Sequence, residues 1–118
     1  MILKGIIGKM KYKIWLDDLR QKPQDTTEYT WLWYKTAEEL IEDLLKKYFN
    51  WHPHSMEIVE ISLDNDLGED LMEGYQVLDW LESLMIPVDF DIHIHTSNSV
   101  ARERMRAIIQ RNGWTEVR

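Results

Sequence analysis

The sequence has no cysteine, and this absence excludes disulfides, thiolate metal sites and cysteine nucleophiles. It also lacks an apolar run long enough to cross a membrane. Residues 1–10 (MILKGIIGKM) do not show the charged, hydrophobic and small-residue order of a signal peptide. These absences are compatible with a cytoplasmic protein, which is the location we expect.

Positive charge is scarce as well, because 14 lysines and arginines face 21 aspartates and glutamates and leave a net charge of −7. We therefore expect no general binding to duplex nucleic acid and no binding to anionic membranes. The exception is the segment 102–118, which contains more arginine than glutamate. A basic last helix on an acidic body indicates that an anion is handled locally.

What the chain does contain is enough apolar material for one core. It has 118 residues, of which 44% are hydrophobic, and six of these are tryptophans. This is the length of one domain. We predict a single domain over residues 1–118, in which residues 1–10 form an N-terminal extension or an edge segment.

Three segments have the apolar spacing of helices. The first begins with the capping box Thr36-Ala-Glu-Glu39. Its apolar stripe comprises Leu40, Ile41, Leu44, Leu45 and Tyr48. The second runs over residues 73–85 and stops before Pro87, and the third runs over residues 99–112 and ends before Gly113. Their predicted inward residues are Val77, Leu78, Leu81, Leu84 and Met85 in the second, and Ala101, Met105, Ile108 and Ile109 in the third.

Strands are predicted between the helices. They lie at residues 12–17, 29–34, 57–64 and 89–95, with a short last one at residues 114–117. Strands that alternate with helices pair in parallel through right-handed crossovers. The connection between the first two strands is too short and too polar for a crossover helix. The pattern predicts an α/β domain with a parallel sheet.

Alternation along the strands separates an apolar face from a polar one. The apolar set is Tyr12, Ile14, Leu16, Val59, Ile61, Leu63, Phe90, Ile92 and Ile94. The polar set is Lys13, Trp15, Glu60, Ser62, Asp91 and His93. We infer that the helices cover the apolar face and that little covers the other. The N-terminal segment, the C-terminal tail or a second subunit would close this open face, so a homo-oligomer is one expectation.

Acidic side chains follow two of the predicted strands. Asp17 and Asp18 come directly after KIWL, and residues 64–68 (DNDLG) come directly after EISL. In open parallel sheets, ligands bind beyond the carboxyl ends of the strands. Carboxylates that meet there repel one another unless a cation neutralises them, and such oxygen ligands suit Mg²⁺, Mn²⁺ or Ca²⁺. The pattern predicts a metal site of Asp17, Asp18, Asp64 and Asp66, although aspartate is also common in turns and helix starts.

Two histidines stand at the end of the fourth predicted strand, in residues 93–99 (HIHTSNS). By alternation Asp17, Asp64 and His95 point to one side of the sheet, and they converge if the strands end level. For His93 we favour a structural role. His95 would protonate a leaving oxygen or bind the ion, or would be structural as well.

An anion site is predicted beside the metal site. Residues 96–98 lead into the last helix, for which Ser99 is a plausible N-cap, and free amides and hydroxyls at such a helix start hold anions. Arg102 follows in the first turn, and Arg20 would reach over the same mouth from the first strand. Ordinary capping and surface charge explain the same residues. The predicted phosphate-binding residues are Arg20, Thr96, Asn98 and Arg102.

With these positions the chain resembles a response-regulator receiver domain. In receivers the positions of Asp17 and Asp18 hold Mg²⁺, that of Asp64 accepts a phosphoryl group and that of Thr96 senses it. The resemblance implies a receiver-like (flavodoxin-like) parallel sheet of 4–5 strands in the order 2-1-3-4(-5), with about three helices mainly on one face. The chain departs from receivers because the first helix, a lysine at the end of a fifth strand and a fifth helix are missing.

A closer match is the receiver-like family named for cyclic-phosphate processing, whose motifs resemble LDDxRxxP, SLDHDLG, GYxVLxWLE and HSxNPVG. The corresponding segments are Leu16–Pro23 (LDDLRQKP), Ser62–Gly68 (SLDNDLG), Gly74–Glu82 (GYQVLDWLE) and His95–Ala101 (HTSNSVA). The resemblance implies a metal-assisted activity on cyclic phosphates, such as RNA 2′,3′-cyclic ends or cyclic nucleotides.

Two departures from these motifs bear on activity. Asn65 replaces the usual histidine of SLDHDLG, which removes one possible acid, base or ligand. Ser99 and Ala101 replace the proline and glycine of NPVG, a change that would reshape the anion loop. Either departure would leave a domain that binds its ligand without turning it over.

Three functions are consistent with these features, in order of preference. The first is a metal-dependent phosphoesterase that acts on a cyclic phosphate with Mg²⁺ or Mn²⁺, His95 and Asp64 being the catalytic residues. The second is a module that binds a nucleotide or phosphate without cleaving it. The third is a phospho-accepting regulator with Asp64 as acceptor. The expected partner of the phosphoesterase or the binding module is a phosphate-containing small molecule or an RNA end.

Overall fold

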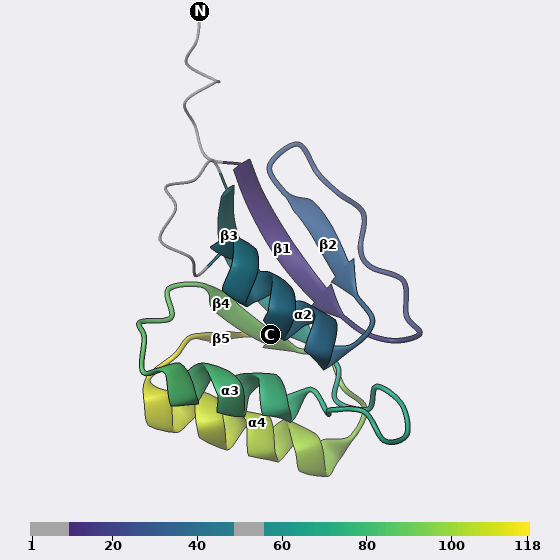
Figure 1. The fold of residues 1–118 in the computed structure, drawn as a ribbon, viewed down its shortest axis with the longest axis vertical. Coiled ribbons are helices and arrows are strands. Elements are labelled where there is room, and N and C mark those ends of the chain that lie inside the picture. The colour runs from purple at the N-terminus through teal and green to yellow at the C-terminus, as the bar shows by residue number, and fades with distance from the viewer. Residues whose placement is uncertain (1–9, 49–55) are drawn as a thin grey trace, which may run out of the picture.

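The computed structural model describes residues 10–48 and 56–118. Its elements are β1 (Met10–Leu16), β2 (Thr30–Tyr34), α2 (Ala37–Asp43), the π-helix η1 (Leu44–Tyr48), β3 (Met56–Leu63), α3 (Tyr75–Leu84), β4 (Asp91–Ile94), α4 (Ser99–Asn112) and β5 (Glu116–Val117). The strands form one five-stranded parallel sheet in the order β2-β1-β3-β4-β5 (Figure 1). The predicted receiver-like α/β fold and strand order are confirmed.

The prediction for the N-terminal segment falls largely outside the described residues. Only Met10 of that segment is described, and it begins β1. In the described part of the chain, no helix is both long and apolar enough to span a membrane.

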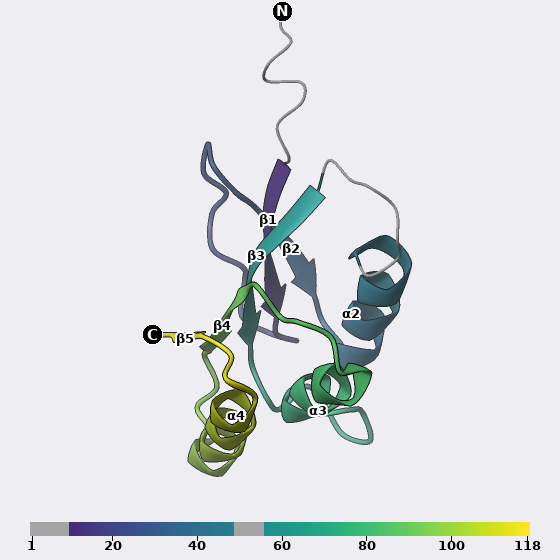
Figure 2. The same ribbon diagram turned by 90° about the vertical axis from the view of Figure 1, so that its left-hand side faces the viewer.

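One face of the sheet shares a hydrophobic core with α2, α3 and α4. The strand residues at its centre have no exposed surface; they are Ile14, Leu16, Ile61, Leu63 and Ile92. Burying each such side chain stabilises the fold by about 1.5–3 kcal/mol. In Figure 2, α2 and α3 stand on the same side of the sheet. The predicted apolar face is therefore the helix-covered face.

One strand residue departs from the predicted alternation. Val59 is predicted to face the core, but the register between β1 and β3 shifts at this point: Tyr12 pairs with Ile58, whereas Lys13 pairs with Glu60. Val59 is the extra residue of a β-bulge, and Ile58 packs against the core in its place. Beyond the bulge the alternation agrees with the prediction, so the last residues of β3 keep their predicted faces.

The start of α2 is as predicted, but its end is not. The hydroxyl oxygen of Thr36 accepts a hydrogen bond from the backbone N–H of Glu39 at 3.1 Å, so Thr36 is the N-cap that the capping box predicts, and its hydroxyl also contacts the Glu39 carboxylate at 3.1 Å. Leu45 is predicted to be buried and is exposed. The α-helix changes there into the π-helix η1, which has more residues per turn, and this rotates Leu45 away from the core. The side chain of Tyr48 lies outside the described residues.

The ends of the other two helices bring two corrections. Met85 is predicted to be buried but is exposed, because α3 has ended and Met85 adopts the left-handed conformation with φ 55°. Ser99 is the first residue of α4 rather than its cap. The cap is Asn98, whose side-chain oxygen accepts the N–H of Ala101 at 3.0 Å. Gly113 follows the end of α4 with φ 69°, as predicted.

The opposite face of the sheet carries no helix within the described residues. Its side chains are polar and aromatic, and the register places on it Lys13, Trp15, Trp31, Trp33, Glu60, Ser62 and His93. The connection from β1 to β2 contains no helix, as predicted, and it lies on this side of the sheet (Figure 2). The indole N–H of Trp15 donates to the carbonyl oxygen of Arg20 at 2.8 Å and ties this connection down. A second subunit on this helix-free face stays a prediction.

Candidate metal centre

Three strands end level at the carboxyl edge of the sheet. The parallel ladder continues one residue beyond β1, β3 and β4: the N–H of Asp64 donates to the carbonyl of Leu16, and the N–H of His95 donates to that of Leu63, both at 2.9 Å. Side chains at the same level and of the same parity lie on the same side of a sheet. The structure thus brings Asp17, Asp64 and His95 together, as the alternation predicts.

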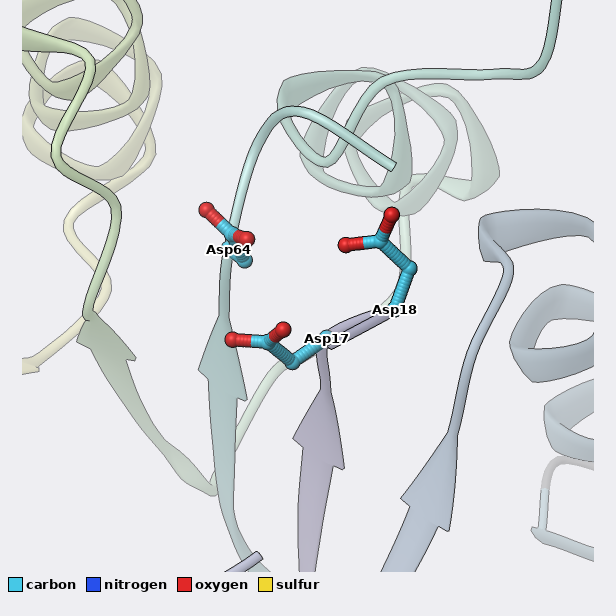
Figure 3. Close-up of side chains that lie close together, drawn as sticks. All are labelled: Asp17, Asp18 and Asp64. Carbon is cyan, nitrogen blue, oxygen red and sulfur yellow. The ribbon is translucent and has the colours of Figure 1, made fainter. Parts of the chain in front are cut away.

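A group of three carboxylates, Asp17, Asp18 and Asp64, occupies this edge (Figure 3). One oxygen of each lies within 4.8 Å of the chosen oxygens of the other two. Oxygens bound to one hard cation at about 2.0–2.6 Å lie roughly this far apart at most. Asp17 and Asp64 are only 1% and 8% exposed, whereas Asp18 is half-buried. The carboxylate group could therefore hold a single metal ion.

Electrostatics at Asp64 favour a cation in this position. Burial is the main cause that raises the pKa of Asp64, and the negative charge of Asp17 raises it further. Hydrogen bonds from the Asn65 N–H and the Thr96 hydroxyl act in the opposite direction, as does the charge of Arg20. A bound cation would relieve both the desolvation and the repulsion.

Protein donors satisfy the three carboxylates to different degrees. Asp17 Oδ1 accepts the N–H groups of Leu19 and Arg20 at 2.8 and 2.7 Å, and Asp17 Oδ2 lies 3.0 Å from His95 Nε2. A carboxylate offers about four acceptor positions, so Asp17 has roughly one left. Asp18, in contrast, has no hydrogen bond or ion pair with another described residue. A cation would therefore find Asp18 most available.

His95 is enclosed by the residues around it. Its side chain is 7% exposed and stacks on the ring of Trp15, with the centroids 3.8 Å apart and the planes at 2°. Nδ1 lies 2.8 Å from Ser62 Oγ, while Nε2 faces Asp17. Burial lowers the pKa of His95 to about 4, although Asp17 acts to raise it. His95 is thus neutral at neutral pH, and both ring nitrogens have partners; its predicted transfer of a proton to a leaving oxygen stays a prediction.

The four predicted phosphate-binding residues lie around the carbonyl end of β4. The guanidinium groups of Arg20 and Arg102 donate to two consecutive carbonyls, those of residues 95 and 96. Thr96 is buried, and its hydroxyl oxygen accepts the N–H of Asn98 at 3.1 Å. Arg20 and Thr96 thus contact Asp17 and Asp64 of the carboxylate group, whereas Arg102 and Asn98 bond to Thr96 and Asp66 next to it. Phosphate binding by them stays a prediction.

Asp66 and Asn65 have positions that the sequence does not reveal. Asp66, the fourth predicted ligand, lies outside the carboxylate group and receives the side-chain amides of Asn65 and Asn98 at 3.1 and 3.3 Å. Asn65 is buried; its amide also donates to Glu73, and its side-chain oxygen accepts the N–H of Tyr75. Asn65 therefore joins the end of β3 to the start of α3.

Two residues that shape the site have no role predicted from the sequence. Ser62 Oγ lies 2.7 Å from His93 Nδ1 and 2.8 Å from His95 Nδ1. The signal was present, because polar residues alternate in step along EISLD and HIH, and β3 pairs with β4. The other residue is Gly74, where a Cβ would lie 1.8 Å from the backbone oxygen of Asp64. Only a glycine allows this close approach of the loop to the site.

The sheet order and the carboxylates at its carboxyl edge define a receiver-like domain. The family model of the cyclic-phosphate processing receiver domain matches residues 12–111. The chain belongs to this family, as its motifs predict. Comparisons with curated proteins and with solved structures gave no match.

Proposed function

We propose that the chain is a metal-dependent phosphoesterase that acts on a cyclic phosphate, such as an RNA 2′,3′-cyclic end or a cyclic nucleotide. The observation that carries the proposal is the buried carboxylate group in a chain of the cyclic-phosphate processing family. A divalent cation, Mg²⁺ or Mn²⁺, supplies Lewis-acid chemistry at a phosphate when it is bound.

The ligand set follows from the contacts of each carboxylate. Asp18 and Asp64 are the main proposed ligands, because Asp18 has no hydrogen-bond or ion-pair partner among the described residues and Asp64 is held in a position where its charge is disfavoured. Asp17 contributes its remaining acceptor position. Asp66 would join them only by leaving its two amide partners.

The phosphate is proposed to lie between the cation and the end of β4. Arg20 Nη1 donates to the carbonyl of His95 and Arg20 Nε lies 3.9 Å from Asp17 Oδ2, while the side chain is 53% exposed, which leaves Nη2 as the proposed donor to a phosphate. Arg102, Thr96 and Asn98 complete the proposed anion side. His95 keeps Asp17 in place, and protonation of a leaving oxygen by His95 would require its Nε2 to leave Asp17.

A second candidate function is a module that binds the same ligand without cleaving it. Two observations favour it. Asn65 stands where the family motif has histidine, and it is buried and tied to the start of α3. Burial lowers the pKa of His95 to about 4, and both of its ring nitrogens are engaged by Ser62 and Asp17. Neither of these two residues therefore offers a free acid or base beside the carboxylate group.

The test is hydrolysis of a panel of cyclic phosphates with Mg²⁺ or Mn²⁺, and then with EDTA. The panel contains 2′,3′-cyclic mononucleotides, cyclic-ended RNA, and 3′,5′-cyclic mono- and dinucleotides. We compare the wild type with Asp18→Asn and Asp64→Asn, and with the control Asp89→Asn, an exposed carboxylate before the amino end of β4.

Turnover that is lost with EDTA and in both site variants, but kept in Asp89→Asn, supports the phosphoesterase. Absence of turnover, with a panel member that still raises the melting temperature, supports the binding module. If neither metal nor any panel member stabilises the wild type, both functions are wrong.

A further inference from the structure

A chain of four polar side chains connects the helix-free face to the carboxylate group. His93 Nδ1 lies 2.7 Å from Ser62 Oγ, and Ser62 Oγ lies 2.8 Å from His95 Nδ1. His95 Nε2 lies 3.0 Å from Asp17 Oδ2. Ser62 is 0% exposed, so none of its contacts is shared with bulk water. The proposed function uses the end of this chain, Asp17, but gives no role to its start.

The donors and acceptors in this chain determine one another. An ionised Asp17 can only accept, so His95 Nε2 carries a hydrogen. A neutral imidazole has a single N–H, so His95 Nδ1 must accept, and its donor is the hydroxyl of Ser62. That hydroxyl has only one hydrogen, so its second partner, His93 Nδ1, must be a donor. The two histidines are thus in opposite tautomers: His93 carries its hydrogen on Nδ1 and His95 carries it on Nε2.

The position of Asp17 depends on the last bond of this chain. Oδ1 is held by two backbone N–H groups, and Oδ2 is held by His95, whose ring is itself clamped against Trp15. These three donors, with Arg20 Nε 3.9 Å from Oδ2, hold the carboxylate in one orientation and leave about one acceptor position for a cation. Side chains that orient a metal ligand in this way typically change the metal affinity by about 10–100-fold when they are mutated.

We propose that Ser62 and His93 are positioning residues of the metal centre, because they hold His95 in the tautomer that presents an N–H to Asp17. The part of this proposal that concerns metal affinity rests on the proposed function. The part that concerns the order of hydrogen bonds is a property of the metal-free protein and is tested separately.

The first experiment is ¹⁵N NMR of the imidazole nitrogens in EDTA-treated wild type and in Ser62→Ala. We expect protonated-type resonances for His93 Nδ1 and His95 Nε2, and unprotonated-type resonances for the other two nitrogens. Ser62→Ala should release His93 into a mixture of tautomers and should shift the resonance of His95 Nδ1. The same tautomer in both histidines, or spectra that Ser62→Ala does not change, would overturn the proposed order of bonds.

The second experiment is titration of Mn²⁺ into a matched pair of variants. In His95→Gln the amide nitrogen matches Nε2 and can donate to Asp17, whereas in His95→Asn it matches Nδ1 and reaches only Ser62. We expect the Kd to rise by about 10–100-fold in His95→Asn and to stay near the wild-type value in His95→Gln. The same Kd comparison applies to His93, the residue at the start of the chain. His93→Asn keeps a donor for Ser62 and should stay near the wild-type Kd, whereas His93→Leu removes the donor and should raise the Kd.

Equal losses in His95→Asn and His95→Gln would overturn the positioning role, because then only the ring itself would matter. If the wild type bound no Mn²⁺, the proposed function would fall together with the metal part of this proposal. The tautomer measurement on the wild type would still decide the order of the hydrogen bonds.

Discussion

The two faces of the sheet bury their side chains by different means. Ile61 and Ser62 are neighbours in β3, and both are 0% exposed. Ile61 belongs to the core under the helices, whereas Ser62 is bonded to two histidines on the helix-free face. A buried apolar side chain stabilises the fold through the apolar surface that it removes from water, and many different neighbours can provide this. A buried hydroxyl instead requires specific hydrogen-bond partners. Changes on the helix-covered face should therefore alter stability, and changes on the helix-free face should alter the site.

The largest effect is expected where the helix-covered side meets the site. In Gly74→Ala the new Cβ would lie 1.8 Å from the backbone oxygen of Asp64, so the loop before α3 must move. We expect a loss in the free energy of unfolding of more than about 3 kcal/mol. In the control Gly113→Ala the Cβ meets nothing within 4 Å, and the left-handed φ of 69° costs only about 1–2 kcal/mol. Urea denaturation measures both, and equal losses would contradict the close approach.

The next effect compares the two neighbours in β3 directly. Ile61→Ala should cost about 2–5 kcal/mol through the cavity that it leaves. Ser62→Ala should cost about 1–3 kcal/mol, because it leaves a buried histidine nitrogen without a partner. The Mn²⁺ affinity should respond in the opposite order, unchanged in Ile61→Ala and weakened in Ser62→Ala. If both variants lost stability and Mn²⁺ affinity together, the proposed division between a stabilising face and a site-forming face would be wrong.

A smaller effect is expected from pH. Burial lowers the pKa of His95 in the folded protein from 6.5 to about 4. The unfolded chain therefore binds this proton at higher pH than the folded one, and the stability that neutral His95 contributes is present above pH 6.5 and lost as the pH falls toward 4.

The control for this pH effect is His95→Gln, which does not titrate. Melting temperatures of the metal-free proteins should fall more steeply for the wild type than for His95→Gln across this window. Parallel profiles would show that His95 is not held neutral. Glu82, whose pKa is lowered to about 2 mainly by its bond to Arg111, is present in both proteins and cancels in the comparison.

The smallest effect is expected from an ion pair on the helix-free face, between the central strands β1 and β3. Lys13 and Glu60 form an ion pair at 3.3 Å, and their side chains are partly exposed. Glu60→Gln should reduce the free energy of unfolding by about 1 kcal/mol, because both side chains keep some contact with water and the glutamine oxygen can still accept from Lys13. It should leave the Mn²⁺ affinity unchanged. A clear loss of Mn²⁺ affinity would show that residues outside the chain of four side chains also affect the metal centre.

The architecture was largely readable from the sequence, because alternation and helical spacing report burial directly. The strand order and the helix-covered face agree with the prediction. The misses at Val59, Leu45 and Met85 share one cause. Each lies where the backbone leaves ideal geometry, through a bulge, a π-helix and a left-handed residue, and a fixed period assigns the wrong face at such a point.

The site was readable only in part. The convergence of Asp17, Asp64 and His95 follows from strand parity, and the sequence shows it. The three hydrogen bonds that Asp17 accepts cannot be predicted in this way, because they depend on the turn at residues 17–20 and on the rotamer of His95. The role of Asn65 was hidden for the same reason, since its partners Glu73 and Tyr75 lie beyond the loop that follows β3.

The most direct test of the account is Mn²⁺-induced broadening of amide NMR signals in the wild type, with Asp18→Asn and Asp64→Asn as site variants. We predict broadening centred on the amides of Asp18 and Asp64 and fading toward the amino ends of the strands, with much weaker binding in each variant. Broadening that is absent, that centres elsewhere or that persists unchanged in both variants would show that the carboxylate group does not hold a metal ion.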